Sequence, residues 1–222
     1  MEYYYPYLIG TGITTEEPVE IERHAEKESY AGICDEIKLG VTLIFYIQNI
    51  AEVIKERQMF GRYKNGISAT RAALAYTGCI SLPVLNTEEQ SRQKEKSTEN
   101  RIHLFAEPRE GNQAAMEHLT LHDMDIYSSL SKRIMKEDIL SIVETSFMPY
   151  GIESDQYMVI GEILNCIKSE NNITKEVIWI MTLNCNDLIF DICINEKDLI
   201  GEPKAGRRFK GRIWMQGRIN YL

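Results

Sequence analysis

Apolar and polar side chains alternate along four stretches in the last third of the chain, between about Gln156 and Leu222. The alternating positions are Tyr157, Val159, Gly161 and Ile163; Val177, Trp179, Met181, Leu183 and Cys185; Leu188, Phe190, Ile192 and Ile194; and Ile213, Met215, Gly217 and Ile219. A period of two is typical of strands, because successive side chains point to opposite faces of a sheet. Since turn residues separate the stretches, we expect one antiparallel sheet that curls into a small barrel.

The first part of the chain mixes strand and helix patterns. Tyrosines and apolar residues from Tyr3 to Ile9 predict a strand, in which Pro6 is typical of a sheet edge. A polar run over residues 20–29 fits a second strand, and residues 74–84 fit another. The apolar residues 41–46 predict a buried strand, and helical spacing follows from Ile47. One continuous helix from Val41 to Arg57 fits the same periodicity, so both alternatives stay open.

A charged segment divides the chain. Residues 88–101 contain no apolar side chain, so they cannot bury a face and are expected to form a linker or a solvated helix. A stripe of Ile126, Leu130 and Ile134 then predicts a helix. We therefore expect an α+β fold with three parts: an N-terminal α+β domain at 1–87, a charged linker and helical segment at 88–150, and a small β-barrel-like domain at 151–222.

Three separated segments carry a resemblance to a known family. They are ERHAEKES at residues 22–29, FMPYGIE at 147–153, and GEP with GRRFKG between 201 and 211. With them the chain resembles domain-of-unknown-function family 3881, an uncharacterised group from anaerobic Gram-positive bacteria. The resemblance implies no activity, cofactor or catalytic residue. It also implies a further segment ahead of the tyrosine-rich strand, in which case the first domain of this chain would be incomplete.

Charge narrows the classes of function. The net charge of −8 disfavours a general nucleic-acid binder, because duplexes are held mainly through neutralised phosphates. Residues 204–222 nevertheless carry six basic side chains and no acidic one, so a local basic surface is expected there. We expect a cytoplasmic protein with no membrane contact, because the longest apolar stretch, Val41 to Ile47, is too short to span a bilayer.

The five cysteines, Cys34, Cys79, Cys166, Cys185 and Cys193, predict neither a disulfide nor a metal site. No two of them have C-x-x-C spacing, and most lie within apolar runs. Buried, reduced thiols are the expected state, and no cofactor is indicated.

The candidates for catalysis are Glu22, His24 and Glu26, which a strand would place on one face. An imidazole between carboxylates suits an oriented general base. Three ligands of this kind are too few to predict a metal, and a solvated face with alternating charges explains the pattern as well. We therefore lean towards a non-enzymatic protein.

The strongest candidate for binding is the basic end of the chain: Arg207, Arg208, Lys210, Arg212, Trp214 and Arg218. Arg212, Trp214, Gln216 and Arg218 alternate with apolar residues, so they are expected on the outer face of the last strand. Tryptophan between cations is typical of small barrels that stack single-stranded nucleic acid. Contacts within one chain explain it too. We expect a binding protein with an unidentified protein partner, the alternatives being a single-stranded nucleic-acid or nucleotide-binding module and an enzyme centred on His24.

Overall fold

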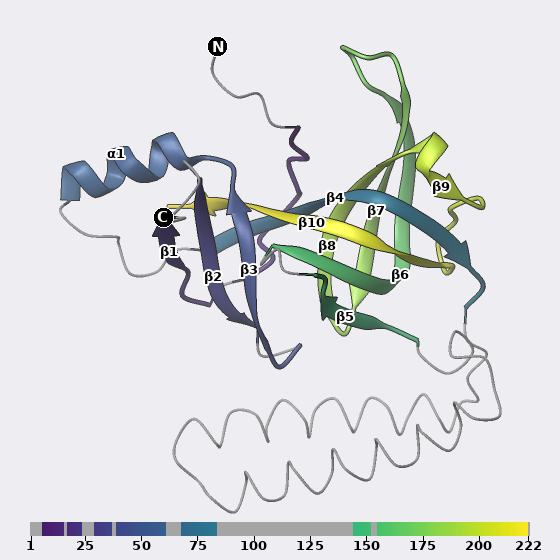
Figure 1. Cartoon of the computed structure of the whole chain (residues 1–222), viewed down its shortest axis with the longest axis horizontal. Helices are drawn as coiled ribbons and strands as arrows, with labels where there is room; N and C mark the ends of the chain where they lie inside the picture. Colours follow the sequence, from purple (N-terminus) through teal and green to yellow (C-terminus); the bar gives the residue numbers. More distant parts are fainter. Residues whose placement is uncertain are drawn as a thin grey trace, which may run out of the picture. The chain divides into compact units, whose positions relative to one another are not determined.

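The structure is a computed structural model of the chain, and it describes residues 6–15, 17–23, 29–36, 39–60, 68–83, 144–151 and 155–221. These residues are mostly β, with one short helix (Figure 1). The strands are β1 (Glu20–Arg23), β2 (Tyr30–Glu36), β3 (Val41–Ile47), β4 (Ser68–Ser81), β5 (Ser146–Pro149), β6 (Gln156–Glu170), β7 (Val177–Cys185), β8 (Leu188–Asn195), β9 (Leu199–Ile200) and β10 (Arg208–Asn220). The helices are α1 (Ile50–Phe60) and the 3-10 turn η1 (Glu196–Asp198).

Five of the strands close into a mixed barrel in the order β10–β4–β8–β7–β6, with β10 pairing again to β6. The barrel is therefore confirmed, and the four strands predicted for it pair antiparallel wherever they meet. The barrel is nevertheless mixed, because β4 from the first part of the chain closes it and runs parallel to β8. A hairpin forces its two strands to be antiparallel, whereas β4 and β8 are joined by a long connection that permits either direction.

Strand β10 joins the early and late parts of the chain (Figure 1). Its whole length pairs with β4, its first half pairs with β6, and Gln216 and Gly217 pair in parallel with β3. Strands β2 and β1 extend the sheet beyond β3, and β5 extends it beyond β6. The strands of the predicted first and third parts thus belong to one sheet and contribute to one hydrophobic core.

The first part of the chain settles the alternative left open at Val41. Strand β3 ends at Ile47 and helix α1 begins at Ile50, so the single helix from Val41 to Arg57 is wrong. Residues 6–9, the described end of the predicted tyrosine-rich strand, are not in a strand. The predicted helix around Ile126 lies outside the described residues, which are mostly β rather than α+β.

The rings of Phe45 and Phe209 pack closely against glycines of β2, β4 and β10. A Cβ atom added to Gly32 or Gly217 would lie 2.4 Å from the ring of Phe45, and one added to Gly78 would lie 2.3 Å from the ring of Phe209. Only glycine leaves room for these buried rings at such close approach. The rings therefore fix β10 at the centre of the sheet.

Candidate binding surface

The inward and outward faces of β10 differ sharply. Ile213, Met215 and Ile219 are fully buried in the core, which confirms that they point inward. Arg212 and Trp214 alternate with Ile213 and Met215 along the strand and are half-buried, on the opposite face. The alternation along β10 therefore brings a cation and an indole to the outside of the barrel.

A β-bulge brings a tyrosine to the same place. Arg212 of β10 pairs with Thr77 of β4, but the next residue, Ile213, pairs with Ala75. Tyr76 is therefore the extra residue of the bulge in β4. The Tyr76 ring centroid lies 4.4 Å from Arg212 Cζ, and the Tyr150 ring centroid lies 5.1 Å from it. Since Tyr76 belongs to β4 and Tyr150 follows β5, the two rings reach Arg212 from opposite sides of β10.

Among the described residues, these rings are what the side chain of Arg212 contacts. It forms no hydrogen bond or ion pair with the described residues, and its Nε is buried without a partner. Neither Nη nitrogen is among the buried atoms that lack a partner, so both are at least partly accessible. Cation–π contacts hold a guanidinium in place without using its N–H donors, so the donors of Arg212 are available.

Trp214 continues the aromatic surface along β10. Its Nε1 donates to Asp155 Oδ2 at 2.7 Å, and its ring lies 5.3 Å from that of Tyr46, which stacks at 6.3 Å on Tyr7. We call Tyr7, Tyr46, Tyr76, Tyr150, Arg212 and Trp214 the Arg212 face. Tyr7, Tyr76 and Tyr150 are 49%, 40% and 39% exposed, so their rings are accessible.

Methionines extend the Arg212 face towards the β5 edge of the sheet. Met158 pairs with Arg212 across β6 and β10, and Met148 pairs with Met158 across β5 and β6. Directly paired residues lie on one face of a sheet, so Met158 neighbours Arg212 and Met148 continues the same face one strand further out. Met148 is 54% exposed.

Of the other predicted basic residues, Arg207 and Arg208 are engaged within the chain, whereas Lys210 is not engaged with the described residues. Arg208 is buried and donates from Nε to the Leu82 carbonyl at 2.8 Å, and desolvation lowers its pKa. Arg207 donates from Nη1 to the Glu202 carbonyl at 2.7 Å. Lys210 is half-buried on the same face as Arg212 and forms no hydrogen bond or ion pair with the described residues.

Arg218 lies at the far end of β10, beside a cavity of about 460 Å³. Its Nη2 is 3.3 Å from Glu52 Oε1, so its charge is already paired with helix α1. Within the cavity wall, Asn220 donates to Thr70, and Thr70 donates to the Gly12 carbonyl. The polar groups of this wall are thus engaged with each other.

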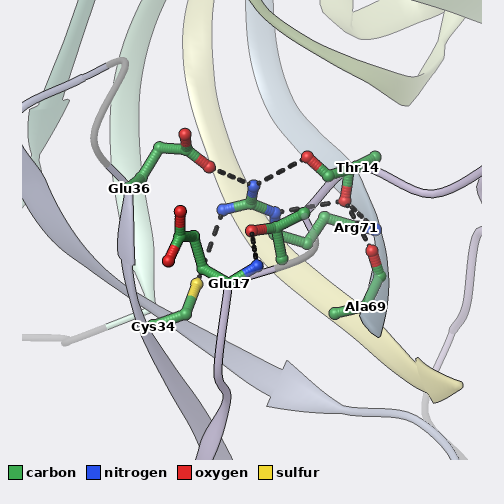
Figure 2. Close-up of polar contacts among 7 residues, drawn as sticks. Thr14, Glu17, Cys34, Glu36, Ala69 and Arg71 are labelled. Carbon is green, nitrogen blue, oxygen red and sulfur yellow. Dashed lines mark hydrogen bonds and ion pairs between the residues drawn. The ribbon is translucent and has the colours of Figure 1, made fainter. Parts of the chain in front are cut away.

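A second arginine, Arg71 of β4, is enclosed near the N-terminal strap, which we define as residues 6–15. Figure 2 shows its guanidinium between Glu36, Thr14 and Cys34. Nη2 lies 2.5 Å from Glu36 Oε2 and also donates to the Thr14 carbonyl, Nε donates to Thr14 Oγ1, and Nη1 donates to Cys34 Sγ. Arg71 is fully buried and Glu36 is 5% exposed, so the pair is almost entirely shielded from solvent.

The Arg71 cluster has the properties of a structural anchor. Burial raises the pKa of the Cys34 thiol to about 11, although the Arg71 charge opposes this, so the thiol is protonated at neutral pH. A protonated thiol is a poor nucleophile. The strap held by Arg71 also covers β10, because Gln216 is buried and donates to the Pro6 carbonyl at 3.0 Å.

The predicted catalytic residues are only partly placed. Glu22 is exposed on β1, whereas His24 and Glu26 lie outside the described residues, so catalysis centred on His24 stays a prediction. Within the described ranges, no three His, Cys, Asp or Glu side chains cluster as metal ligands would. No helix among the described residues is long and apolar enough to cross a membrane.

Sequence reasoning missed the three tyrosines closest to Arg212 and Trp214. Tyr76 reaches Arg212 only through the bulge, and Tyr150 and Tyr46 come from strands that the sequence does not pair with β10. The one available signal was the FMPYGIE segment, which contains Tyr150 and was noted for its resemblance alone.

Comparison with known proteins identifies a family. A family model described as "Domain of unknown function, E. rectale Gene description (DUF3881)" matches residues 1–217. This confirms the resemblance predicted from the three sequence segments. No curated protein and no solved structure matches the chain.

Proposed function

The chain belongs to the DUF3881 family, and from that premise we propose that it is a non-catalytic binding protein whose partner docks on the Arg212 face. The observation that carries the proposal is the state of Arg212. Its guanidinium is held by the rings of Tyr76 and Tyr150, yet it has no hydrogen bond with the described residues. A charged donor group that is fixed in position and left unpaired is suited to receive an external ligand.

The composition of the Arg212 face favours a protein partner. Tyrosine, tryptophan, methionine and arginine are enriched in protein–protein interfaces, and Trp, Tyr and Arg supply most binding hot spots. Tyr76 and Tyr150 offer large rings with few rotatable bonds, so little conformational entropy is lost when they are covered. Met148 and Met158 add adaptable apolar surface beside them.

Single-stranded nucleic acid is the alternative that the tyrosine rings and Arg212 suggest. Such ligands need several cations along the phosphate backbone. Arg207 and Arg208 donate to backbone carbonyls and Arg218 pairs with Glu52. Among the predicted basic residues that the structure describes, Lys210 and Arg212 are left without such a partner, and two cations favour a protein partner over a polyanion.

A peptide selection tests the proposal. We expect a library of random 12-residue peptides, displayed on phage and selected on the full-length chain, to yield binders. Changing Tyr76 and Tyr150 together to serine should weaken their binding by about 30-fold or more, as for hot-spot aromatics. The control is Ile173→Ser, which removes a 76% exposed apolar residue from the turn between β6 and β7 and should leave binding unchanged. No enrichment, or equal loss in both variants, would refute the proposal.

A further inference from the structure

We propose that the partner presents a carboxylate to Arg212, so that the Arg212 face binds an acidic protein segment. This inference rests on the proposed function, because it names the chemistry of the ligand for the same surface. Three features of the surface favour a carboxylate: the guanidinium is partly buried and lacks hydrogen bonds with the described residues, a second cation lies on the same face, and apolar groups flank it.

The guanidinium of Arg212 is partly desolvated and unpaired. Its Nε is buried without a hydrogen-bond partner, while neither Nη nitrogen is among the atoms buried in that way. A cation that has lost part of its hydration gains more from an anion than a fully hydrated one. The two Nη nitrogens present parallel N–H donors, the arrangement that a carboxylate accepts with both oxygens.

Fixing the side chain lowers the cost of binding. The Tyr76 and Tyr150 rings lie 4.4 Å and 5.1 Å from Arg212 Cζ and reach it from strands on opposite sides of β10. A free arginine loses rotamer entropy when it pairs with a carboxylate. Here the rings already restrict the side chain, so less entropy remains to be lost.

The charges near Arg212 favour an anion. Lys210 lies two residues away on the same face and has no ion pair with the described residues. The carboxylate of Asp155 accepts the indole N–H of Trp214 at 2.7 Å and forms no ion pair with Arg212. Although the whole chain has a net charge of −8, Lys210 and Arg212 place two cations on one face of β10.

The flanking groups indicate what surrounds the partner's carboxylate. Met148 and Met158 lie on the same face as Arg212, and the Tyr76 and Tyr150 rings are about two-fifths exposed. Apolar side chains adjacent to the acidic residue would cover these groups and exclude water from the ion pair. An Asp or Glu between apolar residues is therefore the expected motif.

The test uses the peptides selected on the full-length chain, synthesised in their natural form and with each Asp and Glu replaced by Asn and Gln. We expect the selected peptides to share an acidic residue, and the amide forms to bind about 30-fold more weakly. Arg212→Gln should weaken binding of the acidic form by a similar factor and leave the amide form unchanged. Arg23→Gln on the exposed edge strand β1 is the matched control and should alter neither.

The outcomes separate this inference from the proposed function. If peptides bind, respond to the tyrosine variants and yet tolerate both Arg212→Gln and the amide replacement, the carboxylate is refuted and the binding surface stands. If no peptide binding depends on Tyr76 and Tyr150, both the carboxylate inference and the proposed function are refuted. If a dT12 oligonucleotide binds in an Arg212-dependent way and peptides do not, the ligand is nucleic acid and the acidic protein segment is refuted. If the chain self-associates in sedimentation through Arg212 and binds no peptide, the partner is a second copy of the chain and the acidic segment of another protein is refuted.

Discussion

Arg71 and Arg212 lie on neighbouring strands of one barrel, and their surroundings are opposite. Arg71 is fully buried, and Thr14, Cys34 and Glu36 accept from its nitrogens (Figure 2). Arg212 is half-buried, touches two tyrosine rings and has no hydrogen bond with the described residues. The same side chain thus holds the fold together on β4 and presents unused donors on β10.

This contrast distinguishes an arginine that stabilises the fold from one that is suited to bind a ligand. A buried cation whose donors are satisfied within the chain has little left to offer a ligand. A cation held only by aromatic rings keeps its donors while losing its freedom of movement. We infer that the Arg71 cluster was selected for the position of the N-terminal strap and the Arg212 face for contact with another molecule.

The largest expected effect comes from breaking the Arg71 cluster. Arg71→Ala leaves the Glu36 carboxylate buried without its cation, so we expect the free energy of unfolding to fall by about 3–5 kcal/mol. Urea unfolding followed by circular dichroism measures it. Replacing both residues, as Arg71→Met with Glu36→Leu, should restore part of the loss because no charge is then stranded. A cost below about 1 kcal/mol for Arg71→Ala would mean that the cluster is no anchor.

Ile213, which follows Arg212 and points inward, should contribute to stability as a core residue does. Ile213 is fully buried, so Ile213→Ala should lower the free energy of unfolding by about 2–5 kcal/mol through lost apolar contact and the cavity left behind. The same urea titration measures it. Ile200→Ala, at a site 76% exposed, is the control and should cost little. Equal effects at the two sites would contradict the inward orientation of β10.

Alkaline pH should lower the free energy of unfolding through the buried thiols, one of which, Cys34, contacts Arg71. Burial raises the pKa of Cys34 from 9.0 to about 11 and that of Cys185 to about 12. Above pH 9 the unfolded chain loses these protons while the folded chain keeps them, so the free energy of unfolding falls as pH rises. Urea titrations between pH 7 and 10 should follow this decline, with a shallower slope in Cys34→Ala. A flat profile in the parent chain would contradict the burial of both thiols.

The smallest expected effect is on the Arg212 face. Arg212→Gln removes only ring contacts, so we expect the free energy of unfolding to change by about 0.5 kcal/mol or less. A large loss in the same urea titration would show that Arg212 is structural, like Arg71, and the contrast between the two would disappear.

Much of the fold could be predicted because strand periodicity is a local signal. The alternation around Val159, Met181 and Ile213 required only neighbouring residues, and all three are buried. The parallel pairing of β4 with β8 was missed, because it joins distant segments and leaves no trace in either one. The change at Ile47 from strand to helix was visible in the spacing of apolar residues, and the structure excluded the single-helix alternative.

The binding surface was predictable only where it follows β10 itself. Alternation alone predicts Arg212, Trp214 and Gln216 on the outer face, and Arg208 follows the same alternation. Arg208 and Gln216 are nevertheless buried, because the Leu82 carbonyl and the N-terminal strap meet them. Tyr76 depends on a bulge, which shifts a residue to the other face without any change in composition.

The most direct test compares both arginines in one experiment. Arginine Nε–H resonances of the full-length chain, assigned with Arg71→Lys and Arg212→Lys, are recorded by NMR while a selected acidic peptide is added. We predict that the Arg212 resonance shifts in a saturable way with the peptide, while that of Arg71, whose Nε donates to Thr14 Oγ1, stays in place. An Arg212 resonance that does not move when the peptide is bound would contradict the central claim that this arginine receives the partner.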